Sequence, residues 1–266
     1  MAVCPDMELG SPDVKLVELL ADAADVITTS RAGTADLRVE RKPDRTPVSD
    51  ADLAVEEEVR AILARERPDD TIVGEEGGGT ISVGRTWVVD PIDGTKAFLR
   101  GLPVWATLIA LLIDGQPVAG AVSAPALGKR WWAGRGHGAH VRGLDGKTRP
   151  MTVSAVSRLN EAIVSTSHMR TWPEFYDRDA YLALVDACWE DRAYGDFWSH
   201  CLVAEGAIDV AADPIVNIWD VAPLKIIVEE AGGRFTDLAG ADTIAGGNAL
   251  SSNALLHDPA LTLLTR

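Results

Sequence analysis

The sequence predicts an α/β fold built from alternating layers of helices and strands. From about residue 150 onward, short apolar runs typical of strands alternate with segments of helical periodicity. The chain has 266 residues and is 47% hydrophobic, which is enough to bury a sizeable core. No linker rich in Pro, Ser or charge separates residues 1–150 from residues 151–266, so these halves are expected to pack as one structural unit.

The first half is expected to begin with two helices and to continue with strands. Apolar residues recur at helical spacing over residues 13–32, and again after Ser49, where Ser49 and Asp52 resemble a capping pair. The polar segment 34–49 between these helices is predicted to be a loop. Further along, strands are expected at 71–73, 87–89, 104–113, 117–124 and from Trp131, followed by a glycine-punctuated loop at 134–146.

The second half is expected to alternate more regularly. Strands are predicted near residues 162–166, 208–211, 234–237 and 250–255. Helices are predicted near residues 178–190, 196–206 and 221–231, and Gly232 with Gly233 ends the last of them.

Charge and cysteine content exclude several classes of function. With 25 basic and 40 acidic residues the formal net charge is −15, which disfavours nucleic acid and anionic membranes as partners. The most apolar run, residues 104–113, is too short to span a membrane, and the N-terminus does not resemble a signal peptide. The three cysteines form no metal-binding or disulfide pattern. We therefore expect a cytoplasmic enzyme or binding protein.

Acidic residues follow two of the predicted strands. Glu75 and Glu76 come after residues 71–73, and Asp90 and Asp93 come after residues 87–89. Ligand sites in α/β folds gather at the carboxyl ends of strands. Pro91 favours an extended Asp90, so that both aspartates and the Ile92 carbonyl can face one point. Oxygen ligands suit Mg²⁺ or Mn²⁺, although Asp-Pro-x-Asp-Gly could also be a simple turn.

The residues after Asp93 suggest phosphate chemistry. Gly94 and Thr95 lead into a short helix at 96–100, and the start of a helix is a natural cradle for phosphate. Beside bound metal ions, the Thr95 hydroxyl could orient an attacking water while Glu75 takes its proton. Thr95 could equally be an ordinary helix cap. Asp220, ahead of the helix at 221–231, is either an N-cap or a further metal ligand.

Three segments resemble motifs of the inositol monophosphatase family of Mg²⁺-dependent phosphatases. They are GEEGG at 74–78, WVVDPIDGTKAF at 87–98 and WDVAPLKIIVEEAGGRF at 219–235, and the ordered motifs match across residues 42–237. The resemblance implies a layered α/β/α/β/α sandwich, a homodimer, and two or three Mg²⁺ ions per site, with Mn²⁺ as a substitute. It implies as metal ligands Glu75, Asp90, the Ile92 carbonyl, Asp93 and Asp220. It also implies that Gly94 and Thr95 contact phosphate, that Thr95 and Glu75 activate water, and that Asp52 supports Thr95 beneath a loop containing Lys42 and Thr46.

Two further segments, at 96–105 and 192–197, resemble the histidinol-phosphate phosphatase branch of that family, of the actinobacterial type. The inositol branch usually has Gly-Ser/Thr-Ala where this chain has Tyr194, Gly195 and Asp196. Asp196 could pair with the ammonium of histidinol phosphate, whereas Asp213 could bind substrate or belong to a turn with Pro214. The predicted substrate-binding residues are Asp93, Gly94, Thr95, Lys96, Tyr194, Gly195, Asp196, Asp213 and Asp220.

The predicted function is hydrolysis of L-histidinol phosphate, a small phosphorylated metabolite, to L-histidinol and phosphate, a step of histidine biosynthesis. Two alternatives stay open: a phosphatase for inositol 1-phosphate or another small phosphometabolite, and a non-catalytic binder on the same fold. The intact Glu75 and Thr95 favour catalysis, since a binder has no need of a water-activating pair.

Overall fold

The computed structural model describes residues 11–41 and 47–265. Within them the α-helices are α1 (Pro12–Arg31), α2 (Asp50–Glu66), α3 (Thr95–Leu99), α4 (Trp172–Phe175), α5 (Arg178–Ala187), α6 (Asp196–Ala204), α7 (Ile218–Glu230) and α8 (His257–Leu264). Short 3₁₀ turns occur at η1 (Pro125–Leu127), η2 (Leu159–Glu161) and η3 (Met169–Thr171). None of the described helices is both long and apolar enough to cross a membrane.

The strands form two large sheets and one small ribbon. The first sheet has the spatial order β3 (Thr71–Gly74), β4 (Arg85–Asp93), β5 (Ala106–Ile113), β6 (Gln116–Ala124), β7 (Lys129–Gly134), β8 (Gly138–Arg142) and β9 (Thr148–Pro150). The second has the order β11 (Glu190–Arg192), β10 (Ile163–Ser165), β12 (Val210–Asp213), β14 (Ala249–Ser252) and β13 (Arg234–Thr236). The ribbon pairs β1 (Val39–Arg41) with β2 (Pro47–Ser49).

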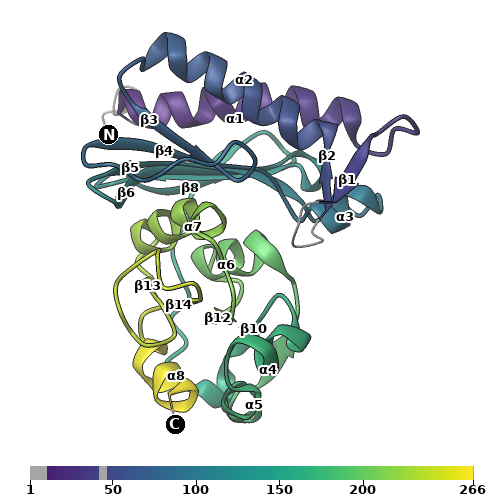
Figure 1. The fold of residues 1–266 in the computed structure, drawn as a ribbon. Coiled ribbons are helices and arrows are strands. Elements are labelled where there is room, and N and C mark those ends of the chain that lie inside the picture. The colour runs from purple at the N-terminus through teal and green to yellow at the C-terminus, as the bar shows by residue number, and fades with distance from the viewer. Residues whose placement is uncertain (1–10, 42–46, 266) are drawn as a thin grey trace.

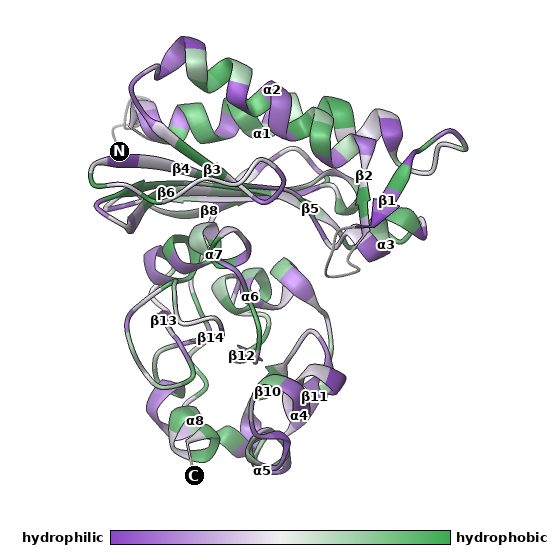
Figure 2. Ribbon diagram, in the orientation of Figure 1, coloured by the Kyte–Doolittle hydropathy of each residue, from purple (hydrophilic) through white to green (hydrophobic). Residues whose placement is uncertain are grey.

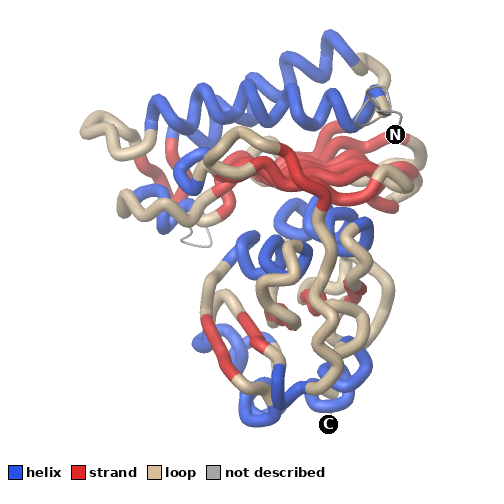
Figure 3. The backbone as a smooth tube through the Cα atoms, turned by 180° about the vertical axis from the view of Figure 1, so that it is seen from behind, coloured by secondary structure: helices blue, strands red, loops and turns tan. Residues whose placement is uncertain are grey.

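Helices and sheets alternate as five layers in the described part of the chain. In Figure 1, α1 and α2 cover one face of the first sheet, and α6 and α7 lie between its other face and the second sheet. The helices α4, α5 and α8 lie beyond the second sheet, and the view from behind in Figure 3 shows the first sheet as one continuous layer. The predicted α/β/α/β/α sandwich is confirmed.

Amphipathic helices hold the outer layer in place. Val17 and Leu20 of α1 and Val59 of α2 are fully buried against the first sheet, around Trp87. Figure 2 accordingly shows hydrophilic and hydrophobic segments alternating along both helices. Burial of one face of each helix is what fixes these segments as helices on this sheet.

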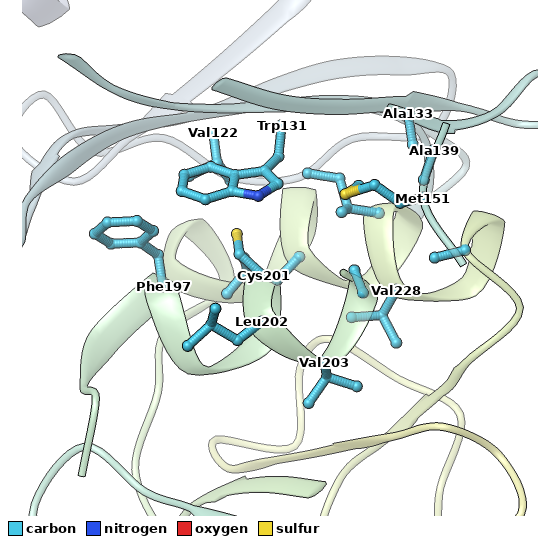
Figure 4. Close-up of a cluster of buried hydrophobic side chains, with 14 of the residues drawn as sticks. Val122, Trp131, Ala133, Ala139, Met151, Phe197, Cys201, Leu202, Val203 and Val228 are labelled. Carbon is cyan, nitrogen blue, oxygen red and sulfur yellow. The ribbon is translucent and has the colours of Figure 1, made fainter. Parts of the chain in front are cut away.

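The middle layer joins the two halves through apolar packing. Trp131 of the first sheet lies against Phe197 and Cys201 of α6, and the rings of Trp131 and Phe197 are 6.0 Å apart (Figure 4). Strand β6 approaches α7 so closely that a Cβ atom on Gly120 would lie 2.8 Å from Pro223 Cα. This close approach lets α7 carry residues of the second half to the edge of the first sheet.

Several local predictions are wrong. The described parts of segment 34–49 contain β1 and β2, and the expected loop at 134–146 contains β8. Strand β4 is longer than predicted and includes the Asp-Pro-x-Asp segment, with an irregular register between Asp90 and Asp93. Whether each of these segments forms a strand depends on its pairing with neighbouring strands. Sequence periodicity over so few residues does not reveal this pairing.

Candidate active site

Four of the predicted carboxylates line one cavity of about 530 Å³. Glu75 follows β3, Asp90 and Asp93 lie in β4, and Asp220 lies in the first turn of α7. The cavity is bounded by the first sheet on one side and by the second half of the chain on the other, so both halves contribute to it.

The irregular end of β4 turns both aspartates toward the cavity. The Thr107 hydroxyl donates to the Pro91 carbonyl at 2.8 Å, which ties the irregular segment to β5. The Ile92 amide donates to Asp90 Oδ1 at 3.1 Å. The Phe197 amide, in the first turn of α6, donates to Asp93 Oδ2 at 2.8 Å, where the helix dipole favours a negative charge. The segment is therefore a fixed strand end and not a free turn.

Glu56 of α2, which sequence reasoning missed, holds the loop that carries Glu75. Its carboxylate accepts from the amides of Glu76 and Gly77, both at 2.9 Å, and pairs with Arg60. A Cβ atom on Gly74 would lie 2.3 Å from Glu56 Cδ, so that position has no room for a side chain. The glycines of the GEEGG segment thus make room for a buried carboxylate, which in turn orients the loop.

Asp220 is not the N-cap of α7 but lies in the first turn of this helix, and its role as a metal ligand stays a prediction. Helix α7 starts earlier than predicted, with Asn217 as N-cap, and Asp220 Oδ2 accepts from the Asn217 amide at 2.7 Å in a capping box. Asp220 also lines the cavity and interacts with Glu75 and Asp90. Its capping bond is therefore compatible with a place among the cavity carboxylates.

The electrostatics of this cluster are those of carboxyl groups that repel one another. Burial, followed by the charges of Glu75, Asp93 and Asp220, raises the pKa of Asp90 well above its usual range. Burial and the charges of Asp196 and Asp220 do the same for the pKa of Asp93. The pKa of Asp220 is raised to about 7, mainly by burial and with a contribution from Glu75. Such a set is stable when protons or cations neutralise it.

The donor set fits magnesium. All its side-chain donors are oxygens, and the Asp90 carboxyl group interacts with those of Glu75 and Asp220. Among the described residues, no three carboxyl, imidazole or thiol groups are already arranged around a metal position. A bound divalent cation would replace the protons that neutralise these carboxyl groups in its absence.

The turn after β4 places Thr95 beside the cluster. Gly94 has φ +80°, and a Cβ atom there would lie 2.7 Å from the Val104 carbonyl oxygen, so the turn requires glycine. The first amides bonded within α3 are those of Ala97 and Phe98, both to the Gly94 carbonyl, which leaves the Thr95 amide ahead of the helix's own bonds. The Thr95 hydroxyl donates to the Ile92 carbonyl at 2.9 Å.

Asp52 is buried at the start of α2. Its Oδ2 accepts from the Ser49 amide at 2.8 Å, which confirms the capping pair. Its Oδ1 is buried with no hydrogen-bond partner in the described part of the chain, and burial together with Glu76 and Glu75 raises the pKa of Asp52 to about 6. No hydrogen bond joins Asp52 to Thr95 among the described residues, and the predicted support of Thr95 stays a prediction. Lys42 and Thr46 lie outside those residues.

Asp196 faces the cavity from the start of α6. Its φ of +49° is unusual for a residue other than glycine, and its amide donates to the Ser167 hydroxyl at 2.7 Å. Burial raises the pKa of Asp196, while His168 and Lys96 oppose the rise. Lys96 lines the same cavity, but Tyr194 and Gly195 are absent from its lining, and Tyr194 instead packs against Trp198.

Asp213 ends β12 and does not belong to a free turn. Its Oδ1 accepts from the Ser167 amide at 2.7 Å, and its Oδ2 contacts His200 Nε2 at 3.1 Å. Although burial opposes it, these bonds lower the pKa of Asp213. Ser167, His168 and His200 also line the cavity and were missed. No motif marks them, because they reach the cavity only through the packing of the second half.

Comparisons with known proteins agree with this geometry. The family model described as "Inositol monophosphatase family" matches residues 12–264. The chain is 53% identical to a histidinol-phosphatase of Mycobacterium tuberculosis, over 95% of this chain and 97% of that protein. It is 50% identical to a histidinol-phosphatase of Streptomyces coelicolor, over 96% and 97%.

Among solved structures, an inositol monophosphatase from Zymomonas mobilis is similar, with 30% identity and a TM-score of 0.82 over 96% of this chain and 98% of that one. Both the sequence motifs and the folded layers are thus shared with known members along nearly the whole chain. The chain belongs to the inositol monophosphatase family, and it is a phosphatase.

Proposed function

We propose that this chain hydrolyses L-histidinol phosphate to L-histidinol and phosphate, with Mg²⁺ bound by Glu75, Asp90, the Ile92 carbonyl, Asp93 and Asp220. One observation supports the proposal most strongly: carboxylates from three distant segments converge in one cavity, next to Thr95. Histidinol-phosphatases at 53% and 50% identity favour this substrate over the other small monophosphates.

Bound Mg²⁺ supplies positive charge that neutralises the carboxylates and the substrate phosphate and lowers the pKa of water. The protein's part begins with holding those carboxylates together. The backbone bonds to Asp93 and Asp220 fix two of them from the first turns of α6 and α7. The Glu56 contacts fix the loop that carries Glu75. The ligand set is therefore positioned by elements of both halves before substrate arrives.

Substrate phosphate would lie at the Gly94–Thr95 turn. The Thr95 amide lies ahead of the bonds of α3 and can donate to a phosphate oxygen. The Thr95 hydroxyl orients the attacking water, and the Glu75 carboxylate accepts the proton that this water loses. Asp52, buried at the start of α2, supports Thr95.

The other end of the substrate carries an ammonium group. Asp196 lines the cavity, and the charges of Lys96 and His168 act on its carboxylate. This carboxylate can accept the ammonium group of a substrate. Histidinol phosphate supplies that ammonium, whereas inositol 1-phosphate has only hydroxyl groups there. Asp196 thus favours the amino alcohol.

A phosphate-release assay tests the proposal. Histidinol phosphate, inositol 1-phosphate and adenosine 3′,5′-bisphosphate are compared at matched concentrations, with Mg²⁺, with Mn²⁺ and with chelator. We expect the highest kcat/KM for histidinol phosphate and no turnover with chelator. Preference for inositol 1-phosphate would overturn the substrate, and binding without turnover would favour a non-catalytic protein.

The two or three metal ions per site, the replacement of Mg²⁺ by Mn²⁺, the homodimer and the cytoplasmic location stay predictions. Metal content by mass spectrometry of the intact protein and molar mass by light scattering would test the first and the third of these directly.

A further inference from the structure

The cavity that holds the carboxylate cluster also has apolar residues in its lining. Phe175 and Ile215 are large hydrophobic residues that line this cavity, and their exposed fractions are 48% and 43%. They lie on the segments that follow β10 and β12, two parallel neighbours in the second sheet. Exposed apolar side chains inside a cavity are typical of a surface that a ligand covers.

The short helix α4 holds Phe175 firmly. Trp172, at the start of α4, is fully buried, stacks on Tyr181 with ring centroids 4.3 Å apart, and donates from Nε1 to the Thr166 hydroxyl at 3.0 Å. After α4, the Tyr176 hydroxyl donates to the Leu238 carbonyl at 3.3 Å. Because both ends of α4 are anchored, the backbone that carries Glu174 and Phe175 is held beside the cavity.

Ile215 is held in a similar way. Asp213, two residues before it, is bonded to Ser167 and His200. The Val216 amide, directly after it, donates to the Gly247 carbonyl at 2.9 Å. The backbone that carries each apolar side chain is therefore held in place by the fold, which lowers the entropic cost of ordering this surface around a ligand.

Glu174 adds an acceptor beside this apolar pair. It lines the cavity next to Phe175 and forms no ion pair with any residue that the structure describes. A planar ring with apolar faces and an N–H at its edge would satisfy both the apolar pair and Glu174. A polyol would place hydroxyl groups against Phe175 and Ile215 and lose hydrogen bonds to water there.

We propose that Phe175, Ile215 and Glu174 form a specificity site for the heteroaromatic ring of the substrate, with Phe175 and Ile215 against the ring faces and Glu174 accepting its N–H. The inference rests on the proposed function and deepens it: Asp196 takes the ammonium, and this site takes the ring. The class of substrate is then a phosphorylated amino alcohol that carries a nitrogen heterocycle.

The experiment compares two substrates on matched variants. Histidinol phosphate carries phosphate, ammonium and ring, whereas L-alaninol phosphate carries the phosphate and the ammonium without the ring. We expect Phe175→Ala and Glu174→Ala each to raise KM for histidinol phosphate about tenfold, with kcat nearly unchanged. Neither variant should change KM for L-alaninol phosphate, and Phe175→Tyr should restore the lower KM for histidinol phosphate.

Trp189→Ala is the matched control, because Trp189 is an exposed aromatic residue, 66% exposed, that does not line the cavity. Equal KM changes for both substrates, or none for either, would overturn the specificity site while leaving the phosphatase intact. If the unaltered protein fails to hydrolyse histidinol phosphate, the proposed function itself falls. Thermal melts of each variant show that the fold is retained.

Discussion

The substitution Asp220→Asn separates the hydrogen bond that Asp220 makes at the start of α7 from its proposed role as a metal ligand. Asparagine keeps a side-chain oxygen that can accept the Asn217 amide, so the capping bond of α7 survives. It removes the negative charge that Asp220 brings to Glu75 and Asp90. If capping is the only role of Asp220, the variant should behave like the unaltered protein.

The structure gives the size of the effect on metal-free stability. The pKa of Asp220 rises from 3.8 to about 7, and at about 1.4 kcal/mol per pKa unit this corresponds to about 4 kcal/mol. Asp220 keeps partial solvent exposure, so water partly solvates and screens its ionised carboxylate. Because of this screening we expect about half of that amount, ~2 kcal/mol.

The sign follows from proton binding. Between pH 3.8 and about 7 the folded protein keeps a proton on Asp220 that the unfolded chain has lost, so the stability of the metal-free protein falls as pH rises through this window. Asp220→Asn removes the contribution of Asp220 to this fall, while the raised pKa values of Asp90 and Asp93 still contribute to it. At pH 8 with chelator, the variant should therefore melt about 4–8 °C above the unaltered protein, at 2–4 °C per kcal/mol.

With Mg²⁺ bound, we expect the unaltered protein to melt at a higher temperature than the variant. The unaltered protein gains stability from metal binding, whereas the variant lacks one ligand and gains less. Its phosphatase activity should fall at least ~100-fold, which is beyond the loss expected of a residue that only supports a ligand. Higher metal-free stability together with lost activity is the expected signature of a metal ligand.

Melting curves at pH 5 and pH 8, with Mg²⁺ and with chelator, and phosphate release measure these effects. Asp177→Asn is the matched control, since Asp177 caps α5 by accepting the Asp179 amide at 2.8 Å and does not line the cavity. If Asp220→Asn matches that control in melting temperature, in metal response and in activity, the assignment of Asp220 to the metal site is refuted.

Three further predictions concern the same cavity. Asp90→Asn should lower activity at least ~100-fold with the fold retained, and near-normal turnover would contradict its role as a ligand. Asp196→Asn should raise KM for histidinol phosphate more than for a phosphomonoester that lacks an ammonium group, such as phenyl phosphate. Equal changes in both KM values would show that Asp196 does not bind the ammonium. Gly74→Ala should displace Glu56, because the new Cβ atom would lie 2.3 Å from the Glu56 carboxyl group. We expect the free energy of unfolding to fall by about 1–3 kcal/mol and kcat to fall as well. Unchanged values of both quantities would contradict the packing argument.

Local sequence motifs were sufficient to predict several residues that the structure brings into one cavity. Pro91 between Asp90 and Ile92, and Gly94 at a positive φ, restrict the backbone within a few residues, so their effect can be predicted without the fold. The capping pair of Ser49 and Asp52 is local in the same sense and is confirmed. The family and the phosphatase class could be predicted from such motifs, because each motif holds its functional side chains within a short segment.

Short strands and long-range supports could not be predicted in this way. Strands β1, β2 and β8 depend on pairing with distant or adjacent segments, and runs of three to five residues carry little periodicity of their own. Glu56 on α2 has no motif around it, yet it orients a loop about twenty residues further along the chain. Its role exists only because α2 packs beside that loop.

The sequence by itself determined which side chains are the candidates for binding metal and phosphate, because the types and spacing of those residues are fixed in the chain. Only the tertiary structure decided that Asp220 reaches Asp90 and that Phe175 and Ile215 share a cavity with both. The physical reason is the burial of α6 and α7 between two sheets, which brings residues more than a hundred positions apart into contact. Such contacts follow from the packing of whole layers and leave no pattern in any single segment.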